Sequence, residues 1–294
     1  MPKQNHLVDT LLMYTKLCFL LSICCCCYLP AQTVLSGSVV DAGTGAPLHF
    51  ATVAVAGQPY GTLTAEDGSF ELNTPETLAP AATIVVSYLG YGAEEYTLAD
   101  LAGGADIKLR PGSLGLPVVE VSSAGELTAI ELGRKERKAI TFYQDVFEQT
   151  YQLASRINNP EKREGVITGI RYYFGKAAKK GKPVRINFYS VDPACDCPGS
   201  PLHASSIIPG KNKSRWNKLD LTADQVVLPA GDFFVAFEWL ALSLPNASAL
   251  NFSIGIIPDR NAAAIYEKVG GAPWAESVKR GIYRPLVRVS GKVN

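Results

Sequence analysis

Histidine is the first residue type to weigh for chemistry, because its imidazole is a common zinc ligand in peptidases. The chain of 294 residues contains three histidines, His6, His49 and His203. His49 is followed by Phe-Ala-Thr and His203 by Ala-Ser-Ser, so neither begins a His-x-x-Glu pair that could converge on one metal. We therefore expect no metal site, and we interpret His49 and His203 as surface or capping residues.

Nucleophilic and acid–base catalysis also lack a complete residue set. The Gly-x-Ser-x-Gly and Ser-x-x-Lys patterns of serine hydrolases are absent from the sequence. Glu238 is the carboxylate that stands out, because it lies in an aromatic stretch where burial would raise the pKa of its carboxyl group. Alternatively, Glu238 faces solvent or pairs with an arginine on a neighbouring strand. We expect a protein that is not an enzyme, with a carboxylate-based hydrolase in the C-terminal part as one alternative.

Tryptophan offers a different chemistry, because exposed aromatic rings stack on the faces of sugars. Of the three tryptophans, Trp239 lies in an apolar stretch that predicts a core strand, whereas Trp216 and Trp274 lie in loop-like contexts. Trp216 and Trp274 are therefore our candidate ligand-binding residues, and the alternative is that they anchor loops over the core. The basic stretches Lys176–Lys182 and Lys211–Lys218 either bind anionic envelope polymers or are solvated loop tips.

The cysteines divide into two groups. Five of the seven lie between positions 18 and 27, and the other two are Cys195 and Cys197 in a stretch rich in proline and glycine. In an oxidising compartment this pair forms a local disulfide; otherwise the residues stay as thiols, or one bonds to a partner. A structural zinc site would need two further ligands. We expect no cofactor.

The N-terminal residues 1–31 have the pattern of a signal peptide. Lys3 and Lys16 precede the apolar run Leu17–Leu29, which is too short to span a bilayer, and Pro30-Ala31 offers a cleavage site before Gln32. A lipoprotein signal at Cys24 to Cys27 is the alternative, although the isoleucine before Cys24 does not suit it. No later apolar run is long enough for a membrane-spanning helix, so we expect a periplasmic, outer-membrane-associated or extracellular protein.

Charge argues against one class of partner. The chain has 28 Lys+Arg and 27 Asp+Glu, and removing Lys3, Lys16 and Asp9 with the leader leaves 26 of each. A neutral protein lacks the basic surface that binds the phosphate backbone, so we expect no nucleic-acid partner.

The sequence of residues 33–110 predicts short strands separated by turns. Glu66-Asp67-Gly68 predicts a hairpin, because an Asp-Gly pair tolerates the positive φ of a tight turn. Six or seven strands at this spacing are typical of an all-β sandwich. The predicted strands are 34–40, 50–55, 62–64, 70–72, 83–88, 95–98 and 107–109.

Several segments of this region resemble the carboxypeptidase-regulatory-like domain family, in the family's order and spacing. They are Ser36-Gly37-Ser38-Val39-Val40-Asp41, Gly45-Ala46-Pro47-Leu48, Glu66-Asp67-Gly68-Ser69-Phe70 and Ser87-Tyr88-Leu89-Gly90-Tyr91. The resemblance implies a transthyretin-like β-sandwich over residues 32–110 that carries no peptidase residues. It also implies an envelope protein of a Gram-negative bacterium, where such a domain often stands at the N-terminus.

The remaining chain divides into a linker, residues 111–140, and a second domain, residues 141–294. The apolar stretch 232–240 predicts a central strand, and residues 184–189 predict a strand that follows 166–174 in a hairpin. Residues 142–157 fit a helix or a strand. The pattern is similar to jelly-roll-type sandwiches of secreted bacterial proteins.

Together these features predict an all-β, exported, non-catalytic cell-envelope or secreted protein with a binding or assembly role. Its partner would be an envelope protein or a polysaccharide. A glycan-binding protein that uses loop aromatics is the second alternative, beside the hydrolase.

Overall fold

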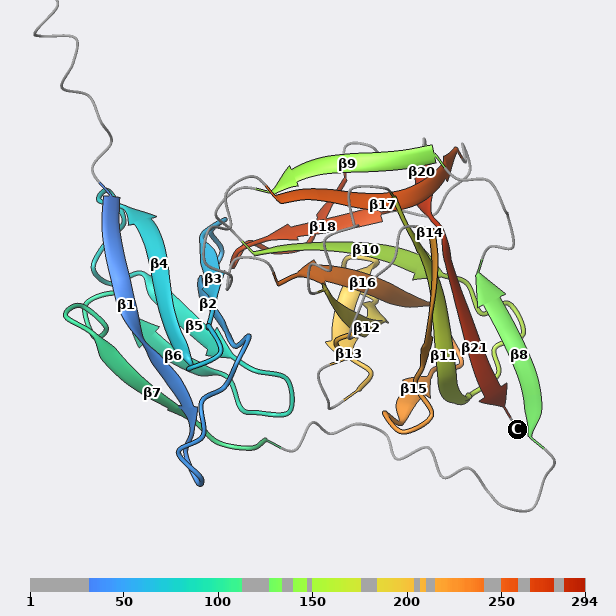
Figure 1. Ribbon diagram of the computed structural model, residues 1–294, viewed down its shortest axis with the longest axis horizontal. Helices are drawn as coiled ribbons and strands as arrows, with labels where there is room; N and C mark the ends of the chain where they lie inside the picture. The colour runs from blue at the N-terminus through green and yellow to red at the C-terminus, as the bar shows by residue number, and fades with distance from the viewer. Residues whose placement is uncertain are drawn as a thin grey trace, which may run out of the picture. The chain divides into compact units, whose positions relative to one another are not determined.

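The computed structural model describes residues 32–112, 127–133, 140–146, 150–175, 184–203, 207–209, 215–240, 250–258, 265–277 and 283–293 (Figure 1). The expected signal peptide and lipoprotein cysteines, the basic stretch Lys176–Lys182 and most of the expected linker lie outside these ranges. The described residues form strands, turns and bends, and among them no helix is long and apolar enough to cross a membrane. This confirms the all-β fold class.

Seven strands build the N-terminal sandwich, as the turn pattern predicts. One sheet has the order β4-β1-β7 and the other the order β3-β2-β5-β6. Alternate residues of β4 and β5 are buried, which is the period of a strand with one face on a core. The strands are β1 (Gln32–Asp41), β2 (Thr52–Val55), β3 (Gly61–Leu63), β4 (Ser69–Pro75), β5 (Thr83–Ser87), β6 (Glu94–Thr97) and β7 (Ala105–Leu109).

The turn at Glu66-Asp67-Gly68 forms, but it does not close a hairpin. Gly68 has a φ of 81°, and its amide donates to the carbonyl of Ala65 at 3.0 Å. The strands on either side, β3 and β4, belong to different sheets. The Asp-Gly signal therefore marks the turn correctly, whereas the expected pairing of these strands is wrong, because the chain crosses between the two layers here.

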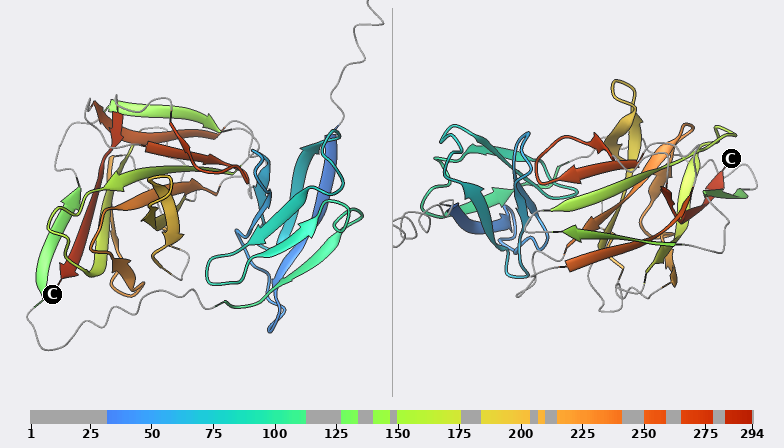
Figure 2. Two further views of the ribbon diagram at one scale, coloured as in Figure 1. Left: turned by 180° about the vertical axis from the view of Figure 1, so that it is seen from behind. Right: turned by 90° about the horizontal axis from the view of Figure 1, so that it is seen from above.

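The C-terminal strands form two larger sheets. The six-stranded sheet has the order β13-β12-β16-β10-β18-β19; the eight-stranded sheet has the path β20-β17-β11-β21-β8, with β14 and β15 paired to β11 and β9 paired to β17. Figure 2 shows these strands and the N-terminal sandwich from behind and from above. The bounds are β8 (Thr128–Gly133), β9 (Ile140–Val146), β10 (Tyr151–Ile157), β11 (Gly165–Phe174), β12 (Val184–Asp192), β13 (Cys197–Pro201), β14 (Arg215–Asp220), β15 (Val226–Leu228), β16 (Phe233–Trp239), β17 (Leu250–Pro258), β18 (Ile265–Val269), β19 (Ala275–Glu276), β20 (Tyr283–Pro285) and β21 (Val287–Val293).

The core of this sandwich lies between the two sheets. Strand β16 is buried along its whole length between β12 and β10, as its apolar sequence predicts. Rings from both sheets meet in the core, where the centroids of Tyr172 and Phe237 lie 5.5 Å apart. The larger core side chains of the two sheets are Ile186, Phe188, Val235, Phe237, Trp239, Ile170, Tyr172, Phe174 and Val289.

The structure decides three points of this half that the local pattern left open or placed differently. Residues 128–133, inside the expected linker, form β8 and pair with β21. The stretch 142–157, which fits a helix or a strand, supplies parts of β9 and β10. Strands β11 and β12 do not form the expected hairpin, because they lie in opposite sheets. In each case the pairing depends on distant strands and not on the local pattern.

Candidate ligand-binding site

Four polar residues form a row across the outer face of the six-stranded sheet. The register places Arg185 of β12 opposite Glu238 of β16, Glu238 opposite Gln152 of β10, and Gln152 opposite Lys268 of β18. Residues directly opposite in antiparallel strands have their side chains on the same face and about 5 Å apart. The alternate residues of the same strands point the other way, into the core; they are Ile186, Phe237 and Leu153.

Glu238 and Arg185 form an ion pair that is almost fully buried. Their exposed fractions are 1% and 5%. Glu238 Oε2 accepts a hydrogen bond from Arg185 Nη1 at 3.1 Å and another from Asn187 Nδ2 at 3.1 Å. Arg185 Nη2 donates to the carbonyl of Phe50 at 2.6 Å. Removing the two charges from water costs several kcal/mol per ion, so a buried ion pair need not stabilise the fold. A functional explanation for the pair is therefore needed.

Two atoms of this pair are left without a hydrogen-bond partner among the described residues. They are Glu238 Oε1, an acceptor, and Arg185 Nε, a donor. Buried polar groups are nearly always paired in folded proteins, and leaving one unpaired costs about 1–3 kcal/mol. The pair therefore presents one strong acceptor and one strong donor to a partner that the described part of the chain does not supply.

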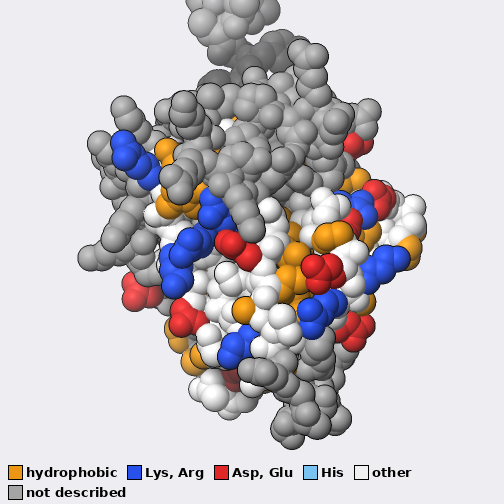
Figure 3. All heavy atoms as spheres, turned by 90° about the vertical axis from the view of Figure 1, so that its right-hand side faces the viewer, with side chains coloured by type: hydrophobic (Ala, Val, Ile, Leu, Met, Phe, Trp, Pro, Cys, Tyr) orange, Lys and Arg blue, Asp and Glu red, His pale blue; other side chains and the backbone are white. Residues whose placement is uncertain are grey.

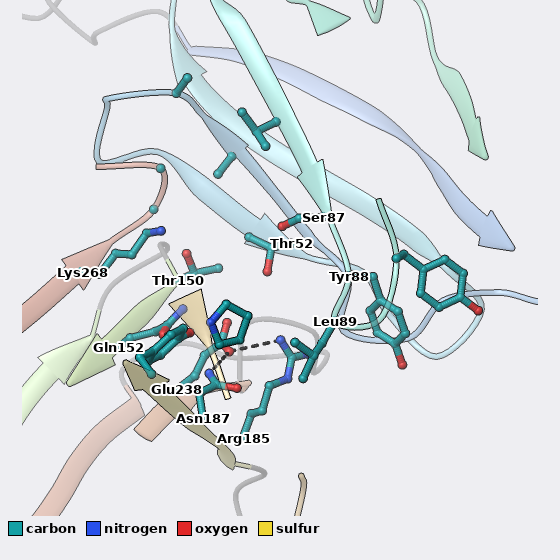
Figure 4. A pocket seen from close by; sticks show the side chains of 18 of the residues that line it. Thr52, Ser87, Tyr88, Leu89, Thr150, Gln152, Arg185, Asn187, Glu238 and Lys268 are labelled. Carbon is teal, nitrogen blue, oxygen red and sulfur yellow. Dashed lines mark hydrogen bonds and ion pairs between the residues drawn. The ribbon is translucent and has the colours of Figure 1, made fainter. Parts of the chain in front are cut away.

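A cavity of about 410 Å³ lies over this row (Figure 4). Its floor carries Arg185, Glu238, Gln152 and Lys268, and its opposite wall comes from β2 and β5, which belong to the same compact unit of the chain. That wall is lined by small or hydroxyl-bearing side chains, namely Thr52, Ala54, Val85 and Ser87. A cavity of this size is within the range of small-molecule sites in proteins.

The rim of the cavity is made by close backbone contacts that only glycine permits. The amide of Thr150 donates to the carbonyl of Gly61 at 3.2 Å, and the amide of Gly57 donates to the carbonyl of Gly271 at 3.0 Å. A Cβ on Gly271 would lie 2.0 Å from the carbonyl oxygen of Val55. Larger residues would therefore push β2 away from the turn that follows β18.

Two further side chains tune the electrostatics of the cavity. Burial lowers the pKa of Lys268, and the charge of Glu238 opposes this effect. Burial also raises the pKa of Tyr189, with a smaller contribution from Glu238 in the same direction. Tyr189 therefore keeps its proton, and its hydroxyl donates to Gln152 Oε1 at 3.1 Å. The lining offers both donors and acceptors, with one carboxylate among its described residues.

The two candidate tryptophans do not form one platform. Trp274 lies between β18 and β19, where its ring is 5.7 Å from that of Tyr189 and 6.0 Å from Lys268 Nζ, and both partners line the cavity. Trp216 lies in strand β14 of the other sheet, so its expected loop position is wrong. Both rings are partly buried, whereas Trp239 is buried in the core, as its apolar strand predicts.

The lining of the cavity does not include Cys195, Cys197, His49 or His203. Cys195 and Cys197 are joined by a disulfide, one of the three arrangements considered for them, and the sulfur atoms of a disulfide are not the thiolate ligands that zinc requires. His203 is fully buried, so its expected surface position is wrong; its Nε2 accepts a hydrogen bond from the amide of Phe188 at 3.2 Å. That bond holds the neighbouring segment against β12.

The sequence pointed to Glu238 and to its pairing with an arginine, but it missed Arg185, Gln152, Asn187 and Lys268 as site residues. A signal for part of the set was present in the stretch Arg-Ile-Asn-Phe-Tyr from position 185, where polar residues alternate with apolar ones. Alternation of this kind indicates a strand with one face outside the core. The stretches around Gln152 and Lys268 carry no comparable signal.

Solved structures that are similar to this chain have low sequence identity. Two structures of the clostridial cysteine protease Cwp84, one after propeptide cleavage and one with the lectin-like domain from Clostridium difficile, are 9% identical with TM-scores of 0.41 and cover 84% of this chain. The chain spans 66% and 59% of their lengths, less than two thirds of each. A carbohydrate-binding module of the β-sandwich superfamily is 12% identical with a TM-score of 0.23, over 84% of this chain and 98% of that one.

At identities and TM-scores this low, these likenesses carry no functional argument. No curated protein matches the sequence. Residues 35–119, however, match the family model of the CarboxypepD_reg-like domain. This match confirms the resemblance drawn from the N-terminal segments: the N-terminal sandwich is a CarboxypepD_reg-like domain.

Proposed function

We propose that the chain is an exported, non-catalytic binding protein of the cell envelope or the secreted fraction, and that its buried polar cavity binds a neutral sugar. The observation that carries the proposal is the buried Glu238–Arg185 pair, whose Oε1 and Nε atoms have no partner among the described residues. A hydroxyl group both donates and accepts hydrogen bonds, so hydroxyls of one ligand can satisfy both atoms.

The other lining groups favour a ligand rich in hydroxyls over an ion. Gln152 and Asn187 supply amides, and Lys268 supplies a further donor beside the carboxylate of Glu238. The described lining holds two cations, Arg185 and Lys268, against the carboxylate of Glu238, and burial lowers the pKa of Lys268, so the excess is at most one positive charge. Tyr189 adds an aromatic ring at the wall, and Trp274 packs against its edge, which supports a role for Trp274 in shaping the sugar site.

Binding is better supported than hydrolysis. Glycoside hydrolysis by the common mechanisms needs two carboxyl groups on either side of the scissile bond. Glu238 is the single carboxylate among the described lining residues, and Arg185 and Asn187 both bind its Oε2 atom.

The test is a glycan array followed by calorimetric titration of the sugars that bind, using the purified protein and Lys268→Met. This variant keeps the length of the side chain and removes its ammonium donor, so we expect about tenfold weaker binding, as for the loss of one hydrogen bond to a charged group. Lys108→Met, on an exposed position of β7, is the matched control and should bind as the unaltered protein does. No sugar binding in the array, or equal affinities for both variants, would contradict the proposal.

A further inference from the structure

A second set of polar residues lies on the outer face of the eight-stranded sheet. The register places Lys218 of β14 and Arg288 of β21 directly opposite Arg171 of β11, one on each side. Three cations therefore stand in one row across three adjacent strands. Like charges directly opposite in a sheet repel each other, so this row favours a negative charge close to it.

The carboxylates of this face stand one row further along. Asp220 lies two residues beyond Lys218 on β14, and Glu131 of β8 lies opposite Ser290, which is two residues beyond Arg288 on β21. Asp220 accepts hydrogen bonds from the amide and the hydroxyl of Thr222, at 3.0 and 2.5 Å, and its charge also interacts with that of Lys218. On the side of the molecule that carries β8 and β21, Lys and Arg side chains form a strip with Asp and Glu side chains beside it (Figure 3).

An aromatic ring stands beside the cationic row. Trp216, two residues before Lys218, is partly buried; its ring lies 4.8 Å from the guanidinium carbon of Arg288 and packs edge-on against Tyr173 at 5.7 Å. These contacts hold the ring in place, so the side chain of Trp216 loses little conformational entropy when a ligand binds. A hollow of about 600 Å³ is lined by this ring, the three cations and Asn217, without a carboxylate among its described lining residues.

We infer that this hollow binds an acidic sugar unit of an anionic polysaccharide. Arg171 and Lys218 bind the carboxylate of the unit, and Trp216 packs against the face of its ring. The arrangement combines charge complementarity with an apolar platform, and an acidic sugar has the matching pair of features. The hollow and the sugar cavity lie on opposite sheets of the sandwich, so one site can fail while the other binds.

Titration of the purified protein with polygalacturonate tests this site, with dextran sulfate and neutral dextran as comparison polymers at low and high salt. We expect saturable binding of polygalacturonate that weakens as salt rises, and no binding of dextran. Arg171→Gln/Lys218→Gln and Trp216→Ala should each weaken polygalacturonate binding by about tenfold or more, from lost charge pairing and lost ring contact. Lys108→Gln, an exposed cation of β7, is the matched control and should leave binding unchanged.

The thermal midpoint supplies a second readout. Because removing Arg171 relieves the repulsion between neighbouring cations, Arg171→Gln should keep or raise the midpoint while binding falls. Absence of polygalacturonate binding, or equal weakening by Lys108→Gln, would overturn the inference. The inference would also be overturned if Trp216→Ala bound dextran sulfate and polygalacturonate as tightly as the unaltered protein does, because that result would show attraction by charge alone.

Discussion

Glu238 and Arg185 form a buried ion pair in the floor of the cavity. Each is held by the other and by one further contact, Asn187 for the carboxylate and the carbonyl of Phe50 for the guanidinium. Their burial means that neither can regain water if its partner is lost. The structure therefore couples the integrity of the binding site to the stability of the sheet that carries it.

At the residue scale we predict an asymmetry between single and double substitutions of this pair. Glu238→Leu leaves the guanidinium of Arg185 buried without its counter-charge, so the free energy of unfolding should fall by about 3–5 kcal/mol. Arg185→Met/Glu238→Leu removes both charges and should cost clearly less. Urea unfolding followed by circular dichroism measures both, and a double variant less stable than the single one would refute this account.

At the scale of elements, turns and strand registers decide which side chains meet. The turn after β1 is closed by Asp41, whose Oδ1 accepts hydrogen bonds from the amides of Gly43 and Thr44 at 2.8 and 2.7 Å. Its Oδ2 accepts from the hydroxyl of Tyr91 at 2.7 Å, which ties the turn to the segment before β6. The hydrogen bond from Tyr91 is the main cause that lowers the pKa of Asp41 to about 2.

The pH dependence of stability follows from this shift. The folded-state pKa of Asp41 is lower than its unfolded value, so its contribution is fully present above about pH 4 and is lost as the pH falls towards about 2. Tyr91→Phe removes the hydrogen bond that is the main cause of the lowered pKa of Asp41. We therefore expect the variant to lose less stability over this pH interval than the unaltered protein does. Thermal melts between pH 2 and pH 5 measure the difference, and parallel curves for the two proteins would be the contrary result.

At the scale of the whole compact unit, the cavity over Glu238 depends on close contact between β2 and the turn after β18. Arg185 reaches the carbonyl of Phe50, and Leu240 packs with Phe50 and Leu63. Gly271 permits the approach because it has no Cβ to meet the carbonyl of Val55. A residue with a side chain at this position would have to move backbone, which is more costly than moving a flexible side chain.

We therefore predict that Gly271→Ala lowers the thermal midpoint by several degrees and weakens sugar binding at the same time, since the added methyl group separates the two walls of the cavity. Gly231→Ala is the matched control, because a Cβ at that exposed position meets no atom within 4 Å. Differential scanning calorimetry and titration with the bound sugar give the two readouts. Equal midpoints and affinities for the two variants would show that the contact does not shape the site.

The sequence alone determined the features that rest on local chemistry. The Asp-Gly turn and the spacing of short strands marked the N-terminal sandwich, the apolar stretch 232–240 marked the central strand, and the quoted segments identified the N-terminal domain. The sequence also flagged Glu238, because a carboxylate within aromatic residues is rare. These features are encoded within a few neighbouring residues, where propensity and periodicity apply.

Only the tertiary structure decided which strands are neighbours. Gln152, Arg185, Glu238 and Lys268 are dispersed over more than a hundred positions, and the order β12-β16-β10-β18 brings them into one row. The same holds for Arg171, Lys218 and Arg288 on the other sheet. Strand order and register are set by packing between distant segments, and no local pattern records them; the hairpins expected at 66–68 and 176–183 failed for this reason.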